Sequence, residues 1–191
     1  MAAEIVDLRV RPGALDGLVV VELKRASDER GSIRELFRRS AFEEAGITLA
    51  PFEQINITES RRGAVRGMHA EEMTKLVSVA AGEVFAVFVD LRDNSPTCGE
   101  VATVDIRPGV QVLVPAGVAN GFQTVSELSQ YVYCFDREWS PDMAGRSVTP
   151  LDPALGVDWP IAIDPTNRAL VSAKDAAAPL LRDVIATGAR S

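Results

Sequence analysis

Histidine and cysteine are scarce in the 191-residue sequence, which contains one histidine, His69, and two cysteines, Cys98 and Cys134. First-row metal sites usually rely on imidazole and thiolate ligands, and a triad of two imidazoles and one carboxylate needs a second histidine. The cysteines stand apart, without the CxxC spacing of a zinc or redox motif. We therefore expect two reduced, partly buried thiols, no disulfide and no bound metal ion.

A basic excess and a long apolar run are also missing. The 20 Lys and Arg residues are outnumbered by 27 Asp and Glu, and the formal net charge of -7 disfavours nucleic acid or an anionic membrane as the main partner. No run approaches the roughly 18 apolar residues of a membrane-spanning helix. The first residues, MAAEIVDLRVRPG, lack the cationic start and apolar core of a secretory signal, so the expected location is the cytoplasm.

The remaining composition is that of a soluble globular protein, with 47% hydrophobic and 25% charged residues, and residues 1–191 fit one domain. Short β-rich runs bounded by Gly, Pro, Ser or Asp follow one another from residue 74 onward: KLVSVAA, EVFAVFVDL, VATVDI, VQVLVP and SQYVYCF. The segment Val84–Leu91 is apolar on both faces, which indicates a strand between two layers that follows a tight turn at Ala81-Gly82. This pattern predicts an all-β sandwich or barrel.

Helical patterns are limited to residues 40–45 and, near the end of the chain, to about residues 172–186. The segment from Pro150 to Pro165 contains four prolines and predicts a loop that lies over the barrel. We expect one β-domain with a helical tail.

The solitary His69, in AVRGMHAEEMTK, is the candidate general base if the chain is an enzyme, because histidine is the one side-chain type whose ordinary pKa lies near neutrality. The residues alone leave simpler roles open. His69 would serve as a structural imidazole, Lys75 as a surface lysine at a strand end, and Asp175 as the acidic third position of a capping box in SAKD. Strand alternation puts Tyr131 and Tyr133 on one inward face, where both would also suit a core.

Two glycine-led spacings resemble the signatures of the cupin superfamily, whose members are small jelly-roll β-barrels. In the first, five residues separate Gly63 from His69. In the second, five residues separate Gly109 from the sequence Pro-Ala-Gly, which is followed by Asn120. In metal-binding cupins these signatures supply histidines, but Glu71 and Asn120 stand at two of the histidine positions here. The resemblance therefore implies a barrel that works without metal and leaves His69 free to move protons.

A longer series of ordered words resembles the dTDP-4-dehydrorhamnose 3,5-epimerase family over about residues 27–179. The words are DERG, QIN, RGMH, KLV, GEVF, VDLR, SPT, DWP and SAKD. The resemblance implies a cupin-type jelly roll with a few short helices and an isomerase that needs no cofactor. Its substrate would be a dTDP-4-keto-6-deoxy sugar of a dTDP-L-rhamnose-type pathway. Carbons 3 and 5 of such a sugar both adjoin the ketone, so each can lose a proton to form an enolate and regain it from the opposite face.

The same resemblance implies four catalytic residues. His69 matches the base, Asp175 the carboxylate that hydrogen-bonds its imidazole, Lys75 the cation facing the sugar's oxygen 4, and Tyr133 the general acid.

The substrate-binding positions of the family are matched by Arg30, Glu35, Gln54, Asn56, Arg66, Asn120 and Trp139. The two arginines match contacts to the diphosphate, which suits their forked guanidinium groups. Trp139 takes a position where many relatives carry a tyrosine and stack an aromatic ring on the ligand. Family members are homodimers in which the early strands of one protomer complete the pocket of the other, so Arg30 is expected to act across the interface.

Two departures from the family pattern keep other functions open. Asn120 replaces a common histidine and cannot titrate, and Trp139 cannot serve as a phenolic acid. The alternatives are an epimerase acting at carbon 3 or carbon 5 only, and a cupin that binds a sugar nucleotide without turnover. A metal-dependent cupin enzyme is disfavoured by the single histidine.

Overall fold

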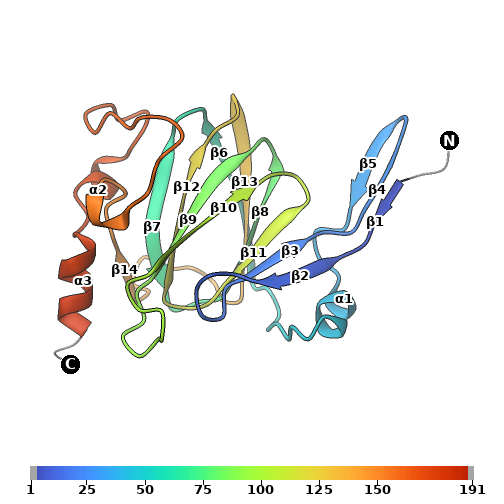
Figure 1. Ribbon diagram of the computed structural model, residues 1–191, viewed down its shortest axis with the longest axis horizontal. Helices are drawn as coiled ribbons and strands as arrows, with labels where there is room; N and C mark the ends of the chain where they lie inside the picture. Colours follow the sequence, from blue (N-terminus) through green and yellow to red (C-terminus); the bar gives the residue numbers. More distant parts are fainter. Residues whose placement is uncertain (1–3, 189–191) are drawn as a thin grey trace.

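A computed structural model describes residues 4–188 and shows two antiparallel β-sheets packed face to face, with a smaller sheet extending from one end (Figure 1). The five-stranded sheet has the order β10 (Val101–Ile106), β9 (Val84–Asp90), β12 (Val118–Thr124), β7 (Val65–Glu71) and β14 (Gly145–Ser147). The six-stranded sheet has the order β2 (Arg9–Pro12), β3 (Val19–Glu22), β11 (Val110–Val114), β8 (Lys75–Ala81), β13 (Leu128–Phe135) and β6 (Gln54–Arg61). The all-β prediction is confirmed.

The main core lies between the two large sheets and follows from strand alternation. Along β9, Val84, Ala86 and Phe88 point into this core, whereas Val87 and Val89 belong to a second cluster on the outer face of the sheet. The prediction that this strand is buried on both sides is therefore correct. The turn at Gly82 joins β8 of the six-stranded sheet to β9 of the five-stranded sheet, so it connects two layers rather than two paired strands.

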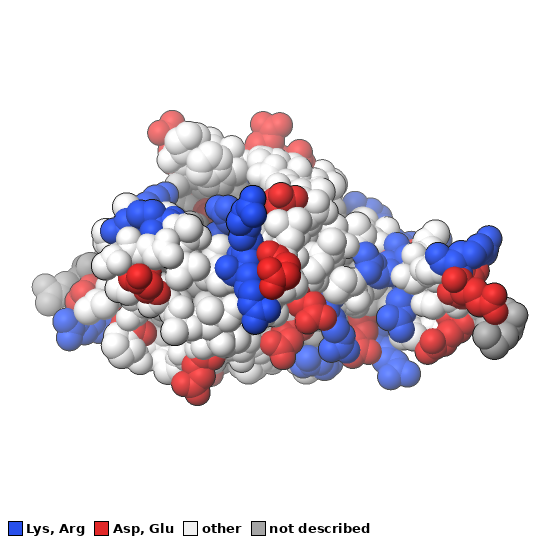
Figure 2. Space-filling view, turned by 90° about the horizontal axis from the view of Figure 1, so that it is seen from above, with Lys and Arg blue, Asp and Glu red and all other residues white. Residues whose placement is uncertain are grey.

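The small sheet consists of β1 (Glu4–Val6), β4 (Arg25–Asp28) and β5 (Gly31–Arg34) and forms an arm that projects from the barrel, at the right of Figure 1. Its apolar side chains have little to pack against, and Ile5 and Ile33 are 62% and 73% exposed. Figure 2 shows acidic and basic side chains close together on this end of the molecule. The arm therefore has no core of its own.

Four short helical segments complete the structure: α1 (Arg39–Glu44), the 3-10 helix η1 (Pro153–Leu155), α2 (Ala173–Ala176) and α3 (Leu181–Gly188). The first confirms the helix expected near residues 40–45. The single helix expected over about residues 172–186 is wrong, because the chain is non-helical between α2 and α3 where Pro179 lacks an N–H group. Asp152 accepts the backbone N–H of Leu181 at 2.7 Å and so caps the start of α3. Within residues 4–188, no helix is long and apolar enough to cross a bilayer.

The C-terminal part of the chain covers the outer face of the five-stranded sheet, at the left of Figure 1. Leu181 and Val184 of α3 join the outer cluster, and the Trp159 ring meets Phe85 of β9 edge-on at a centroid distance of 6.0 Å. The proline-rich segment from residue 150 to 165 is thus a loop over the barrel, as its composition predicts.

Candidate active site

A cavity of about 210 Å³ opens at one end of the barrel, between strands of both large sheets. It brings together seven of the eleven side chains that the sequence singles out, and two more contact its wall. The cavity is lined by Asn56, Thr58, Arg66, Gly67, His69, Glu71, Lys75, Asn120, Tyr133, Phe135 and Trp139.

A bulge in β7 explains why Arg66 and His69 line the same cavity although alternation puts them on opposite faces. The ladder between β7 and β12 pairs Asn120 with His69 and Phe122 with Arg66, so β7 carries one extra residue there. Gly67 occupies the bulge with φ +107°, and a Cβ atom at this position would lie 2.6 Å from the carbonyl oxygen of Asn120. Only glycine fits this backbone without displacement.

His69 and Asp175 meet across 106 positions of sequence, with 2.8 Å between His69 Nε2 and Asp175 Oδ1. Asp175 lies in α2, and the segment before this helix is tied to the barrel by a parallel bridge between Val65 and Val171. Ser172 Oγ accepts the backbone N–H of Asp175 at 3.0 Å, so Ser172 is the N-cap of α2 and Asp175 lies in its first turn, as the word SAKD predicts. The backbone N–H of Asp175 is therefore bound by the helix cap, while its side chain holds the imidazole.

Asp175 is buried, and the pKa of its carboxyl group nevertheless lies below the ordinary aspartate value. Burial raises this pKa, but the hydrogen bonds from His69, Ser172 and the Gly67 N–H together outweigh burial and lower it. Asp175 is therefore a carboxylate at neutral pH. It can accept the Nε2–H of His69 and stabilise the imidazolium form.

Lys75 begins β8, and its side chain is 5% exposed. Its ammonium group contacts the carboxylate of Glu71 and donates to the backbone carbonyl oxygen of His69 at 3.1 Å. The cation is thus held beside the histidine at the cavity wall.

Tyr131 and Tyr133 lie on one face of β13 as alternation predicts, with ring centroids 4.8 Å apart, but only Tyr133 lines the cavity. Burial raises the pKa of Tyr133, so its phenol stays protonated near neutral pH. Tyr131 is fully buried and stacks on Phe122 with 4.1 Å between ring centroids. Its hydroxyl accepts a hydrogen bond from Asn120 Nδ2 at 3.3 Å.

Polar side chains from β6 and the segment after β13 form one edge of the cavity. Gln54 donates to Asn56 Oδ1 at 3.1 Å and accepts the backbone N–H of Trp139 at 2.7 Å. Trp139 is 48% exposed, which leaves an aromatic surface at the rim. Arg66 donates from Nε to Ser60 Oγ at 2.8 Å, which fixes its guanidinium group at the cavity.

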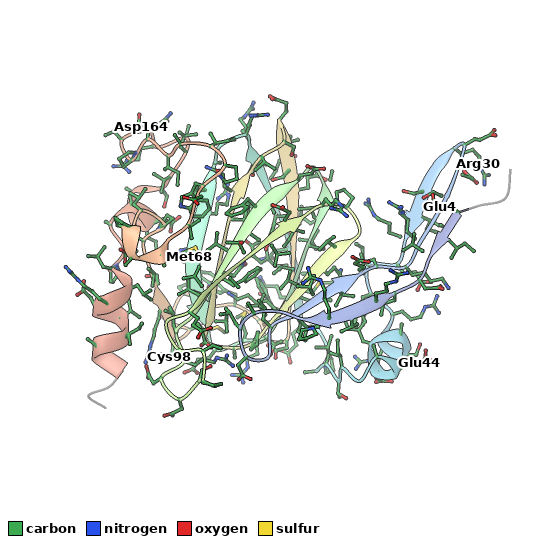
Figure 3. All side chains as sticks on the ribbon, viewed as in Figure 1. Glu4, Arg30, Glu44, Met68, Cys98 and Asp164 are labelled. Atoms are coloured by element: carbon green, nitrogen blue, oxygen red, sulfur yellow. The ribbon has the colours of Figure 1, made fainter. Side chains whose placement is uncertain are left out.

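Arg30 and Glu35 do not line this cavity in their own chain. Arg30 lies at the tip of the arm, 90% exposed and paired with Asp28 at 2.5 Å. Figure 3 shows Arg30 on the projecting arm and Met68, the neighbour of His69 in sequence, in the body of the barrel. Glu35 accepts from Arg38 Nε at 2.8 Å at the base of the arm.

Three further lining residues are not among the predicted candidates, although strand alternation from the predicted positions points to them. Thr58 lies two residues beyond Asn56 on β6, Glu71 two beyond His69 on β7, and Phe135 two beyond Tyr133 on β13. Each therefore shares a strand face with a residue that was already a candidate.

The carboxylates nearest to His69 are engaged with basic groups, Asp175 with the imidazole and Glu71 with the ammonium of Lys75. Among the residues that the structure describes, no three His, Cys, Asp or Glu side chains form a group suited to a metal ion. The arrangement offers one acid–base pair and one oxyanion-stabilising cation around a common cavity.

Comparison with known proteins identifies relatives over most of the chain. A family model described as dTDP-4-dehydrorhamnose 3,5-epimerase matches residues 12–183. The dTDP-4-dehydrorhamnose 3,5-epimerase of Salmonella typhimurium is 37% identical over 180 residues, covering 91% of this chain and 96% of the relative.

Solved structures of two epimerases share the fold. RmlC from Legionella pneumophila, a 3,5-epimerase in complex with dTDP-4-keto-L-rhamnose, aligns with a TM-score of 0.82 and 37% identity over 92% of this chain and 94% of that one. ChmJ from Streptomyces bikiniensis, a 3'-monoepimerase in complex with dTDP-quinovose, aligns with a TM-score of 0.84 and 33% identity over 93% and 90%. The fold is thus the cupin-type jelly roll, and the chain belongs to the dTDP-4-dehydrorhamnose 3,5-epimerase family.

Proposed function

We propose that this protein is an epimerase of a dTDP-linked 4-keto-6-deoxyhexose that inverts carbons 3 and 5 through an enolate. The observation that carries the proposal is the 2.8 Å contact between His69 and Asp175 at a cavity that also contains Lys75 and Tyr133. A base with a carboxylate partner, a cation and a protonated phenol are the groups that removal and return of a proton beside a ketone require.

His69 is the base in this mechanism. Its Nε2–H is held by Asp175, so the other ring nitrogen takes the proton from carbon 3 or carbon 5 while the carboxylate stabilises the imidazolium that forms. The electron pair of the broken C–H bond forms a double bond between that carbon and carbon 4, and the ketone oxygen becomes an enolate oxygen.

Lys75 and Tyr133 complete the cycle. The ammonium of Lys75 stabilises the negative charge on oxygen 4, and the Tyr133 phenol returns a proton to the opposite face of the carbon as the ketone re-forms. His69 then loses its proton to solvent and Tyr133 regains one, so each inversion introduces a solvent hydrogen into the sugar.

Substrate binding involves the remaining candidates. Arg66 binds the diphosphate, Asn56, Gln54 and Asn120 contact the sugar or nucleoside, and Trp139 stacks on the base. Arg30 and Glu35 do not line the cavity of their own chain, which supports their acting on the second protomer of a homodimer. The expected location of this dimer is the cytoplasm.

Exposed apolar side chains support such a homodimer. Ile5 and Ile33 on the arm and Ile55 and Ile57 on β6, at the edge of the six-stranded sheet, are each more than 60% exposed. A second copy of the chain would cover such exposed side chains.

Epimerisation at a single carbon is the second candidate. It is favoured by the similarity to the 3'-monoepimerase ChmJ and by Asn120, which supplies an amide beside His69 in the strand ladder.

The test of both candidates is to incubate the protein with dTDP-4-keto-6-deoxyglucose in heavy water and follow deuterium by NMR. Label at carbons 3 and 5 is expected, label at one carbon selects the monoepimerase, and binding without label refutes both.

His69 is tested in the same assay by His69→Ala and His69→Asn. Both variants are expected to lose label at both carbons while keeping most of their affinity for dTDP, because the imidazole faces the sugar rather than the diphosphate. Label incorporation at the wild-type rate in either variant would refute the assignment of the base.

A further inference from the structure

Glu71 is an acidic side chain in a cavity proposed to bind an anionic sugar nucleotide. It ends β7, shares the face of His69 two residues earlier, and has a side chain that is 18% exposed. Its carboxylate contacts the ammonium of Lys75 across the cavity wall. A carboxylate at this place would repel the substrate unless it serves another group, and Lys75 is the group that it touches.

The hydrogen bonds of Lys75 define the direction of its ammonium group. A lysine has three N–H donors on a flexible stem. One faces the Glu71 carboxylate and one donates to the carbonyl oxygen of His69 at 3.1 Å, and both acceptors belong to β7. Because the stem is buried, the third N–H is the one left to point into the cavity.

Charge pairing leads to the same conclusion. A buried ammonium is costly unless a carboxylate pairs with it. Among the described residues, Glu71 is the carboxylate that forms an ion pair with Lys75, whereas Asp175 pairs with His69. His69 and Lys75 thus each have their own acidic partner.

We propose that Glu71 is a positioning residue that pairs with the charge of Lys75 and aims its remaining N–H at oxygen 4 of the keto sugar. The inference rests on the proposed epimerase function and adds a fifth residue to its machinery. Glu71 acts through Lys75 and takes no proton from the sugar.

The test compares Glu71→Ala and Glu71→Gln with the wild type in the heavy-water assay. Misdirecting one catalytic group lowers turnover, so Glu71→Ala is expected to reduce kcat about 10- to 100-fold while dTDP affinity from calorimetry changes less than about twofold. Glu71→Gln keeps an acceptor oxygen and is expected to recover part of the loss. Glu72→Ala, an exposed neighbour outside the cavity, is the control and should match the wild type.

A double-mutant cycle shows whether Glu71 acts through the lysine. In a Lys75→Met background, Glu71→Ala should cause no further loss of kcat/KM, because the group that Glu71 positions is gone. Additive losses, wild-type kcat in Glu71→Ala, or equal losses of kcat and dTDP affinity would overturn the proposal. Absence of label in the wild type would instead refute the epimerase function and, with it, this inference.

Discussion

His69 and Tyr133 reach the cavity from different sheets, His69 from β7 of the five-stranded sheet and Tyr133 from β13 of the six-stranded sheet. In the proposed mechanism, a sugar ring bound between them presents one face to each residue. This separation is what inversion needs, because a proton removed on one face must be replaced on the other.

Tyr133→Phe separates proton removal from inversion. Without the phenol, His69 still removes a proton and can return a solvent deuteron to the same face, so the sugar gains label but keeps its configuration. We expect the rate of inversion to fall about 10²- to 10³-fold, with a smaller fall in exchange. NMR measures both in one sample, and equal losses of label and inversion would contradict the role of Tyr133 as acid.

Arg66→Ala addresses binding rather than chemistry. Its guanidinium is held at the cavity through Ser60, and losing a charged contact to the diphosphate is expected to weaken dTDP binding about 10- to 100-fold. At saturating substrate, kcat should stay within a few-fold of the wild type. Calorimetry with dTDP checks the first expectation, and unchanged affinity would exclude a diphosphate contact.

At the scale of strands and turns, the link between β8 and β9 has little tolerance for change. Gly82 has φ +75°, and a Cβ atom there would lie 2.1 Å from the carbonyl oxygen of Leu128. We expect Gly82→Ala to lower the free energy of unfolding by about 2–4 kcal/mol, measured by urea denaturation. Gly46→Ala, with φ +81° and open space around it, is the control and should cost about 1 kcal/mol. Equal losses in both variants would rule out the clash.

Asp90, the last residue of β9, is expected to make the stability of the fold depend on pH. Asp90 is buried, and although burial raises its pKa, hydrogen bonds from Arg92, Ser95 and Thr97 lower it far below the ordinary value. A lowered folded-state pKa stabilises the fold above the ordinary carboxyl pKa, and this stabilisation is lost as the pH falls below it.

Asp90→Asn tests this dependence. We expect the variant to be less stable than the wild type by about 3 kcal/mol at pH 7, because it breaks a buried charge network. The difference should shrink as the pH falls below about 4, where the unfolded wild-type carboxyl group binds its proton. Urea denaturation at several pH values measures it, and a difference that stays constant down to pH 3 would contradict the account.

Local patterns predict the strands well but not their placement. The two apolar faces of Val84–Leu91 could be predicted from the sequence, because the alternation of side chains along a strand is a local property. The same sequence did not show that the turn at Gly82 changes sheets, since a paired hairpin uses the same residues. Alternation also places Arg66 away from His69, and the bulge at Gly67 that reverses this depends on packing against Asn120.

The contact between His69 and Asp175 was expected through resemblance to a family, and no local pattern shows it. The capping word SAKD predicts a helix start but gives no direction for the aspartate side chain. The helix break near Pro179 could have been predicted from the sequence, because proline lacks the backbone N–H that a continuing helix needs.

At the scale of the whole molecule, Arg30 lies on the projecting arm (Figure 3) and is not among the residues that line the cavity, so one chain does not bring it to its own His69. If the arm completes a partner's pocket, mixed dimers of Arg30→Ala and His69→Ala contain one pocket with both changes and one with neither. Such dimers, purified with two tags, should regain about half of the wild-type activity.

The control is a mixed dimer of His69→Ala and Asp175→Ala. These residues share one pocket in one chain, so each pocket of the mixed dimer carries one defect and no activity should return. Equal activity in the two mixed dimers, or failure to isolate a dimer, would contradict a pocket shared between protomers.

The His69–Asp175 pair is assembled from the middle of the chain and from its C-terminal helical segment, which is tied to the barrel by the Val65–Val171 bridge, by hydrogen bonds such as Asp152 to Leu181, and by apolar contacts. Detachment of that tail separates imidazole from carboxylate while every strand of the two large sheets stays paired. During synthesis, the barrel strands leave the ribosome before Asp175 does, so the His69 imidazole lacks its carboxylate partner until the end of the chain has packed.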